Sequence, residues 1–489
     1  MDVTEQTRIK QKAGQGVFIL VLRYGLCFLL NFGGSVLLVR ILGAKVWGQY
    51  ALSFFVFTSF IFVTQGLWGY IIQRPEPPQK QLGMCFLIQQ ALSLVWGIVV
   101  LVGLNPLIVR RFGGEGVGLM VAGAVLGGYF YSWRWLLSAW QERKMDYVGV
   151  GASEVLDALV FNLTAVAFAL AGWGVWGIAI GNAARGLVSA IYMLFRSRLR
   201  IEFVWKWQYL REIFSFGLPF MMYTSLQWLP TQALPVMVGF FLGPAALGYV
   251  NIAYKFMEYP RVLVALVTRV SFNYFSRLAS DTELFRQEAF KSFEVLFFLL
   301  GLAITVLAGS GLVWLPVIYG KDFRLSAVIM ALVSIPFFVN GCLTFFAASH
   351  SARGRVKEVA LVQVGYNAVF WASALVLIPR LKDWGLPAGE WIALPFGLLL
   401  VYFVSRDIGR IWPLSKLTHL LLSAIAILGS SFLFYRELYA WGFLTFFAGI
   451  AASVLVQFKT ARTVMGYAGQ LSIWFKWRVP EQPPTMRQP

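Results

Sequence analysis

Apolar runs of about 20 residues recur from one end of the chain to the other, and each is long enough to cross a hydrocarbon layer about 30 Å thick as a helix. Of the 489 residues, 59% are hydrophobic and 13% are charged, whereas ordinary soluble domains carry about 25% charged residues. Backbone groups in lipid must satisfy their own hydrogen bonds, and uninterrupted runs of this length fit helices rather than barrel strands. The sequence therefore predicts an all-α polytopic membrane protein.

We expect about 14 transmembrane helices. The candidate spans lie at residues 15–39, 47–72, 82–104, 117–141, 147–171, 174–195, 213–241, 245–270, 293–316, 326–348, 358–378, 388–404, 417–434 and 438–457. If the N-terminus is inside, most of the 41 lysines and arginines fall in cytoplasmic segments, which is the asymmetry of the positive-inside rule. The formal net charge of +19 is thus explained by topology rather than by a nucleic-acid partner. It predicts two cytoplasmic termini and an attraction to the headgroups of membrane lipids.

A repeated phrase divides the chain into two halves. Residues 42–48 read LGAKVWG and residues 242–248 read LGPAALG, and each phrase lies between the first and second span of a block of six. Two six-helix blocks that enter the membrane from the same side imply a parallel internal repeat. The predicted parts are an N-terminal lobe (1–195, spans 1–6), a basic amphipathic cytoplasmic linker (196–212), a C-terminal lobe (213–404, spans 7–12), two extra spans (405–457) and a cytoplasmic tail (458–489).

The chain lacks the motifs of the commoner kinds of membrane enzyme. There is no G-x-x-x-x-G-K-[ST] phosphate loop, so ATP hydrolysis within the chain is unsupported. The two histidines, His350 and His419, have no partner at metal-ligand spacing. We therefore predict no catalytic residue, no metal and no cofactor.

Charged side chains inside the predicted spans are the strongest functional signal. A charge at mid-bilayer costs at least about 2.5–3.5 kcal/mol on insertion scales, so each one needs a physical reason. The basic ones are Arg23, Arg134, Arg185, Lys255, Arg261 and Arg269. On a helical wheel, the basic residues of span 8 and Glu258 fall within an arc of about 120°. Such a stripe indicates a water-filled cavity or a helix–helix contact. The alternative is an internal Lys255–Glu258 ion pair, with Arg269 reaching the cytoplasmic surface.

Acidic residues inside the spans are fewer. Glu154 and Asp157 are spaced i,i+3 on one face of span 5, and Glu258 lies in span 8. A cavity with more basic than acidic groups prefers an anion, and a phosphate-bearing ligand that crosses the bilayer fits this expectation.

Several stretches resemble the polysaccharide flippases of the MOP superfamily. They are LVRILGAKVWGQYALSFF and GLWGYIIQRPE within 38–76, GWGVWGIAIG at 172–181, LGPAALGYVNIAYKFMEYP and FSRLASD within 242–281, and ARGRVK at 352–357. The resemblance covers about spans 1 to 12 and implies two six-helix lobes around a central cavity. It also implies a bacterial inner-membrane protein that moves undecaprenyl-diphosphate-linked oligosaccharides to the outer leaflet by alternating access, for O-antigen or exopolysaccharide synthesis.

The resemblance gives the charged residues roles. The diphosphate would be held by basic side chains, since arginine matches its geometry; these are Arg23, Arg134, Arg185, Lys255 and Arg261. Relatives often carry an acid before the glycine near position 66 and an Asp-Asn pair near 234–235, where this chain has Thr64-Gln65 and Leu234-Pro235. Any coupling to H⁺ or Na⁺ would then use Glu154, Asp157 or Glu258. A polysaccharide polymerase and export machinery are the implied protein partners.

Three other functions compete with this interpretation. A cation-coupled multidrug exporter of the same superfamily would be expected to have an acidic cavity. A membrane glycosyltransferase or polymerase usually needs a sizeable outer loop that carries catalytic charges, and the longest outward loops here are about a dozen residues. A scaffold in a polysaccharide assembly complex is the third alternative.

Overall fold

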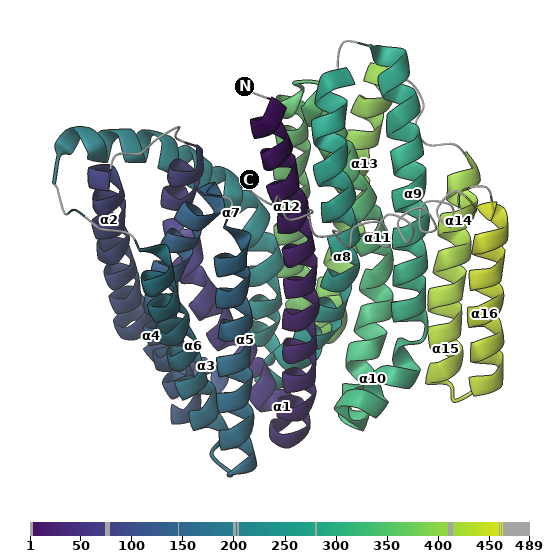
Figure 1. The fold of residues 1–489 in the computed structure, drawn as a ribbon. Helices are drawn as coiled ribbons and strands as arrows, with labels where there is room; N and C mark the ends of the chain where they lie inside the picture. Colours follow the sequence, from purple (N-terminus) through teal and green to yellow (C-terminus); the bar gives the residue numbers. More distant parts are fainter. Residues whose placement is uncertain are drawn as a thin grey trace, which may run out of the picture. The chain divides into compact units, whose positions relative to one another are not determined.

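The computed structural model describes residues 3–73, 79–144, 146–198, 202, 205–278, 281–408, 414–458, 460 and 462. Every regular element among them is helical (Figure 1). The α-helices are α1 (Val3–Gln73), α2 (Gln79–Ile98), α3 (Asn105–Phe112), α4 (Glu115–Arg143), α5 (Tyr147–Leu170), α6 (Gly174–Ser197), α7 (Trp207–Leu242), α8 (Pro244–Leu278), α9 (Thr282–Gly309), α10 (Gly311–Tyr319), α11 (Arg324–Ala352), α12 (Val356–Leu381), α13 (Gly385–Ile408), α14 (Leu414–Ala424), α15 (Ser430–Tyr435) and α16 (Tyr439–Val456). Two π-helical segments, η1 (Val99–Leu104) and η4 (Ile425–Gly429), and two 3₁₀ turns, η2 (Lys321–Phe323) and η3 (Lys382–Trp384), connect some of them.

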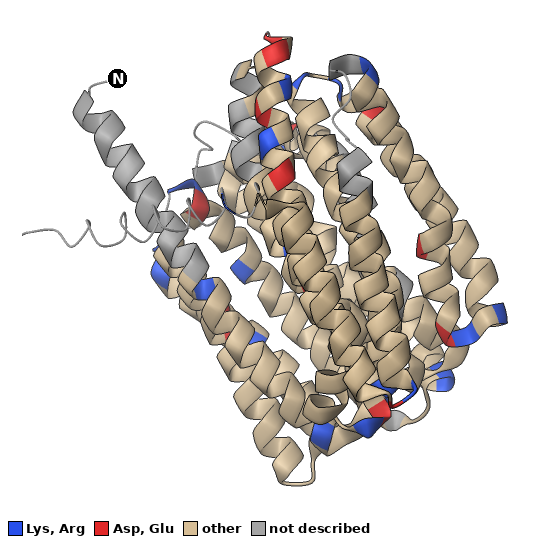
Figure 2. Cartoon of the chain, turned by 90° about the vertical axis from the view of Figure 1, so that its right-hand side faces the viewer, with Lys and Arg blue, Asp and Glu red and all other residues tan. Residues whose placement is uncertain are grey.

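The predicted all-α membrane fold is confirmed. Ten stretches of the described chain are long and apolar enough to cross a membrane. Two of these, Leu22–Ile72 and Val356–Arg406, are 51 residues long, so each holds two of the predicted spans. The two remaining predicted spans lie on α7 and α8. Figure 2 shows the charged residues mainly toward the ends of the helices, with long uncharged stretches between them.

The described chain forms two compact units. Unit 1 comprises 1–253, 315–326 and 367–389, and unit 2 comprises 254–314, 327–366 and the chain from 390 onward. In unit 1, α4 packs on α6 and α1, and α5 packs on α6 and α1. In unit 2, α14 and α15 pack on α16, and all three pack on α9. The division at the linker 196–212 stays a prediction, and the tail 458–489 lies almost wholly outside the described residues.

The repeated phrase has the same backbone conformation in both halves. Gly43 has φ 76° and ψ 173°, and Gly243 has φ 97° and ψ 173°. This region of φ and ψ is essentially restricted to glycine, because a Cβ would collide with the backbone. Gly43 kinks α1 between the first two predicted spans, and Gly243 separates α7 from α8. The repeat seen in the sequence is therefore also a repeat of local structure.

The two phrases pack directly against each other within unit 1. A Cβ built on Gly48 would lie 1.7 Å from the carbonyl oxygen of Pro244, and one built on Gly248 would lie 2.2 Å from that of Ala44. Residues 44 and 48 correspond to 244 and 248 in the repeat, so each phrase presents the same two positions to the other. Such reciprocal contacts are the mark of a two-fold relation.

Side chains on either side of these glycines follow the same reciprocal pattern. Trp47 donates a hydrogen bond from Nε1 to Oδ1 of Asn251 at 3.1 Å. In the repeat, Leu247 corresponds to Trp47 and Ala51 corresponds to Asn251. Leu247 and Ala51 are likewise brought together, buried in one hydrophobic cluster. We call the contact formed by 44–51 and 244–251 the repeat seam.

Two arginines near the repeat seam cap helix ends. Arg40, before the kink of α1, donates to the carbonyls of Val317 and Ile318 at the end of α10. Arg111 of α3 donates to the carbonyl of Phe241 at 3.0 Å and to that of the preceding residue, at the end of α7. The last carbonyls of a helix have no partner within it, so a guanidinium is well suited to them. In the first contact the donor, Arg40, lies on the first predicted span of α1. In the second contact the donor, Arg111, lies on the short helix α3.

Candidate functional site

Helix α5 presents two carboxylates to its neighbours in unit 1. The helix begins after Asp146, whose side chain accepts a hydrogen bond from the backbone N–H of Gly149 at 3.2 Å and so caps the N-terminus. Glu154 and Asp157 follow one helical turn apart, as the sequence predicts. Because α5 packs on α1 and α6, with α4 also in contact, these carboxylates face helices that carry arginines.

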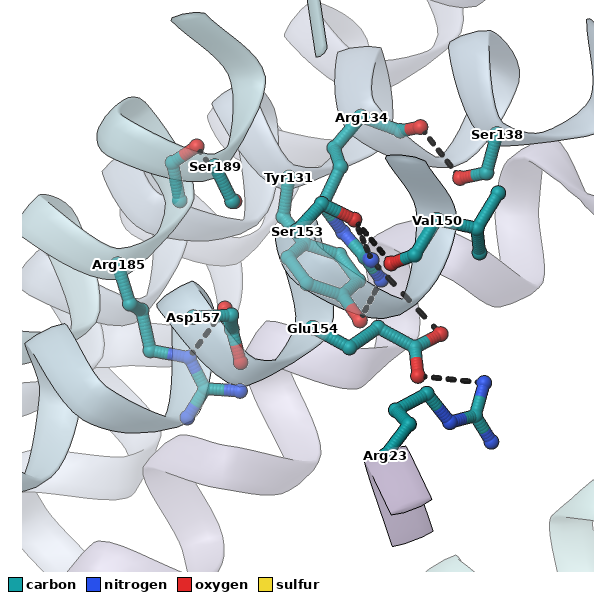
Figure 3. Close-up of polar contacts among 11 residues, drawn as sticks. Arg23, Tyr131, Arg134, Ser138, Val150, Ser153, Glu154, Asp157, Arg185 and Ser189 are labelled. Atoms are coloured by element: carbon teal, nitrogen blue, oxygen red, sulfur yellow. Dashed lines mark hydrogen bonds and ion pairs between the residues drawn. The ribbon is translucent and has the colours of Figure 1, made fainter. Parts of the chain in front are cut away.

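Glu154 is shared by two arginines (Figure 3). Its Oε2 lies 2.6 Å from Nη1 of Arg23 on α1, and its Oε1 lies 3.8 Å from Nη1 of Arg134 on α4. Arg134 is also held by the hydroxyls of Ser153, at 3.0 Å, and Tyr131. Hydroxyl and carboxylate acceptors together compensate a guanidinium whose side chain is 1% exposed.

Asp157 pairs with Arg185 of α6. Arg185 donates from Nε to Oδ1 of Asp157 at 3.1 Å. The guanidinium carbon lies 4.1 Å from the ring centroid of Phe57 and 5.1 Å from that of Phe161. Aromatic faces attract a desolvated cation, so this side of the pair is enclosed by apolar rings.

These side chains form one group, which we call the arginine–carboxylate cluster: Arg23, Arg134, Glu154, Asp157 and Arg185. The sequence predicts two separate roles for them, with the arginines binding an anion and the acids coupling an ion. The structure brings all five together, and each acid is paired with at least one arginine. Three guanidiniums and two carboxylates leave one positive charge in excess.

The other predicted site residues lie on α8 in unit 2. Arg261 and Glu258 form an ion pair, with Nη1 2.7 Å from Oε1, and both side chains are exposed to more than a third. Lys255 lies one turn earlier and is partly buried. The sequence suggested a Lys255–Glu258 ion pair as one alternative. In the structure, Glu258 pairs with Arg261. The side chain of Arg269 lies outside the described residues.

One buried acid was missed by the sequence reasoning. Glu390 on α13 is 5% exposed and accepts a hydrogen bond from the hydroxyl of Tyr254 on α8 at 2.8 Å. Nearby in unit 2, the Nδ2 of Asn340 donates to the hydroxyl of Tyr366 at 3.4 Å. The available signal was the place of Glu390 just inside the predicted span 388–404, a depth at which an acid is easily taken for an interfacial residue.

The described residues hold no group of three histidine, cysteine or acidic side chains that would bind a metal. Ion pairs and hydrogen bonds instead account for the charged groups that cluster inside unit 1. The excess of guanidinium over carboxylate groups in the arginine–carboxylate cluster is suited to holding an anion.

Comparison with known proteins identifies the fold. The polysaccharide biosynthesis protein family matches residues 37–328, more than half of the chain, whereas no curated protein sequence matches. Among solved structures, an inward closed conformation of the lipid II flippase MurJ superposes with a TM-score of 0.73 at 13% identity, covering 92% of this chain and 100% of that one. An inward-facing multidrug resistance MATE transporter of the MOP superfamily superposes with a TM-score of 0.63 at 15% identity, covering 80% and 98%. The chain belongs to the polysaccharide biosynthesis protein family and has the fold of these membrane transporters.

Proposed function

We propose that this protein is a flippase that moves undecaprenyl-diphosphate-linked oligosaccharides from the cytoplasmic to the outer leaflet of a bacterial inner membrane. Both termini are cytoplasmic in this proposal. The two lobes rock in alternating access while the lipid tail stays in the bilayer, and the sugars pass through the central cavity. The oligosaccharides then serve the synthesis of a cell-surface polysaccharide, with a polymerase and export machinery as partners.

The excess positive charge of the arginine–carboxylate cluster is the observation that carries the proposal. A guanidinium within a membrane span costs several kcal/mol unless it is paired. Two carboxylates offset two of the three arginines, and a diphosphate supplies the missing negative charge. Arginine binds phosphate oxygens through two parallel N–H donors, which fixes the headgroup as well as attracting it.

Lys255 and Arg261 are the proposed headgroup contacts on α8. Arg261 is paired with Glu258, so the headgroup would have to compete with that carboxylate for Arg261. If transport is coupled to H⁺ or Na⁺, the proposed coupling acids are Glu154, Asp157 and Glu258. A proton or cation bound at one of them would change the net charge that the diphosphate meets.

A multidrug exporter is the second candidate function, and the structural similarity to a MATE transporter favours it. That similarity, at 15% identity, concerns the fold. A cationic drug would be repelled by a site with an excess of arginine over carboxylate. The family description and the sign of the cluster charge therefore support the flippase over the exporter.

The test uses a strain that lacks the gene and measures lipid-linked oligosaccharide accessible from the outer side of the membrane. The intact gene, Arg23→Ala, Lys255→Ala and Arg110→Ala are each returned on a plasmid. Arg110 is an exposed arginine on α3, outside the cluster, and serves as the matched control. Membrane insertion of each variant is checked in parallel.

The proposal predicts that the intact gene and Arg110→Ala restore outward exposure, and that Arg23→Ala and Lys255→Ala do not. Exposure that never depends on the gene would refute the flippase. Gene-dependent resistance to cationic drugs in the same strain would instead support the exporter. Normal transport by both Arg23→Ala and Lys255→Ala would refute the assignment of the basic residues.

A further inference from the structure

Among the described side chains of the arginine–carboxylate cluster, one carboxylate has two cationic partners. Glu154 lies 2.6 Å from Arg23 and 3.8 Å from Arg134. The two arginines differ in exposure, since the side chain of Arg23 is 12% exposed and that of Arg134 is 1% exposed. Figure 3 shows Glu154 between them, with Arg23 at the outer end of the chain of contacts. The shorter contact is thus made by the arginine that a ligand can reach more easily.

Glu154 is compensated even when Arg23 leaves it. Arg134 is held in place by the hydroxyls of Ser153 and Tyr131, so it stays beside the carboxylate. The Glu154 side chain is 27% exposed, and removing the partner of such a partly buried charge is normally destabilising. Here that cost is reduced, because the second guanidinium is already within 4 Å.

The second pair of the cluster lacks this property. Asp157 has an ion pair with Arg185, and no other ion pair to Asp157 occurs among the described side chains. Arg185 also lies against Phe57 and Phe161. A ligand that took Arg185 would leave Asp157 without its counter-ion and would have to displace aromatic rings. The Asp157–Arg185 pair is therefore a fixed element of the site.

We propose that the carboxylate of Glu154 is an internal stand-in for the diphosphate, which displaces it from Arg23 when the substrate binds. The inference rests on the proposed function and narrows it. Arg23 is the residue of the cluster that contacts the headgroup, whereas Arg134 and Arg185 are positioning residues.

Competition between Glu154 and the ligand predicts that removing the Glu154 charge raises the affinity for an anion. Neutralising an acid that competes for the site should strengthen anion binding, whereas a purely structural acid would weaken it when changed. The test measures binding of inorganic pyrophosphate to the purified full chain in phosphatidylcholine nanodiscs, where no anionic lipid competes. We expect Glu154→Gln to bind pyrophosphate about tenfold more tightly than the unchanged protein, which corresponds to about 1.4 kcal/mol. Arg23→Ala should lose binding, and Arg23→Lys should recover part of it.

Asp146→Asn is the matched control for Glu154→Gln. Asp146, the N-cap residue of α5, is also a carboxylate paired with an arginine, since its Oδ2 lies 2.8 Å from Nη2 of Arg196. Asparagine at this position preserves the helix cap. This control should leave pyrophosphate affinity within about twofold, a change under 0.5 kcal/mol at tenfold per 1.4 kcal/mol. Arg134→Ala should weaken binding in the otherwise unchanged protein, because Glu154 then holds Arg23 alone. The same substitution should have little effect in the Glu154→Gln background, a coupling that a merely structural role would not produce.

The outcomes separate this inference from the proposed function. If pyrophosphate binds and Glu154→Gln binds it no more tightly than Asp146→Asn, the exchange is refuted while the flippase proposal stands. Equal effects of Arg134→Ala in both backgrounds would also refute the exchange. If no form of the protein binds pyrophosphate, the diphosphate substrate fails and the exchange fails with it.

Discussion

The repeat seam allows one substitution to be predicted with its sign and size. A Cβ on Gly48 would lie 1.7 Å from the carbonyl oxygen of Pro244, whereas ordinary van der Waals contact begins at 3.4 Å. The difference, 3.4 − 1.7 = 1.7 Å, must be absorbed by backbone, since the obstructing atom is a carbonyl oxygen and not a flexible side chain. Overpacking of this kind costs about 1–3 kcal/mol, and more where the backbone cannot move. Gly48→Ala should therefore destabilise the protein.

Gly33→Ala is the matched control, because Gly33 lies on the same helix and a Cβ there meets nothing within 4 Å. Alanine is preferred to glycine in a helix by roughly 0.5–1 kcal/mol, so this substitution should be neutral or stabilising. The assay is thermal unfolding of each purified variant in the same detergent. Gly48→Ala should lower Tm, and Gly33→Ala should leave it unchanged or raise it.

Equal Tm values for the two variants would refute the close approach at the repeat seam. The reciprocal geometry adds a second check at Gly248, where a Cβ would lie 2.2 Å from the carbonyl oxygen of Ala44. Gly248→Ala should lower Tm as well. A loss of stability at Gly48 alone would contradict the two-fold relation between the phrases.

Three further substitutions test other contacts. Gly243→Ala forces a Cβ into a backbone conformation with φ 97°, which should cost about 1–3 kcal/mol; an unchanged Tm would contradict this strain. Asp157→Asn leaves the guanidinium of Arg185 without its counter-ion and should cost about 3–5 kcal/mol, so a Tm equal to that of the unchanged protein would show that the pair is not buried. Arg111→Ala removes donors from the last carbonyls of α7, so amide hydrogen exchange at that helix end should become faster, whereas it should stay the same in Arg110→Ala.

The sequence predicted the helices correctly because the lipid environment constrains each apolar segment independently of the rest of the chain. Lipid offers no hydrogen-bond partner, so an apolar run of about 20 residues has to be a helix whatever it packs against. The predicted spans accordingly are helical, although the span 293–316 crosses a break at Ser310 between α9 and α10. Gly43 and Gly243 could also be identified from the sequence as parts of a repeated phrase, since a conformation that favours glycine requires glycine at both positions.

The sequence did not allow the ion pairs between helices to be predicted. Helical periodicity puts Glu154 and Asp157 on one face of α5, but it does not identify the helix that this face meets. The partners lie far away in the chain, as with Arg185, which is 28 residues from Asp157, and Tyr254, which is 136 residues from Glu390. The basic residues were therefore expected to be free for a ligand, whereas in unit 1 they are largely neutralised by acids.

The sequence by itself determined the helical character of the spans and the excess of basic residues within them, because these follow from the cost of exposing backbone and charge to lipid. Tertiary structure alone decided that Glu154 has two arginines and Asp157 has one. Which charges meet depends on how helices distant in sequence pack together. That packing is set by contacts at many positions, such as the close approach of Gly48 to Pro244, and no single segment of the chain encodes it.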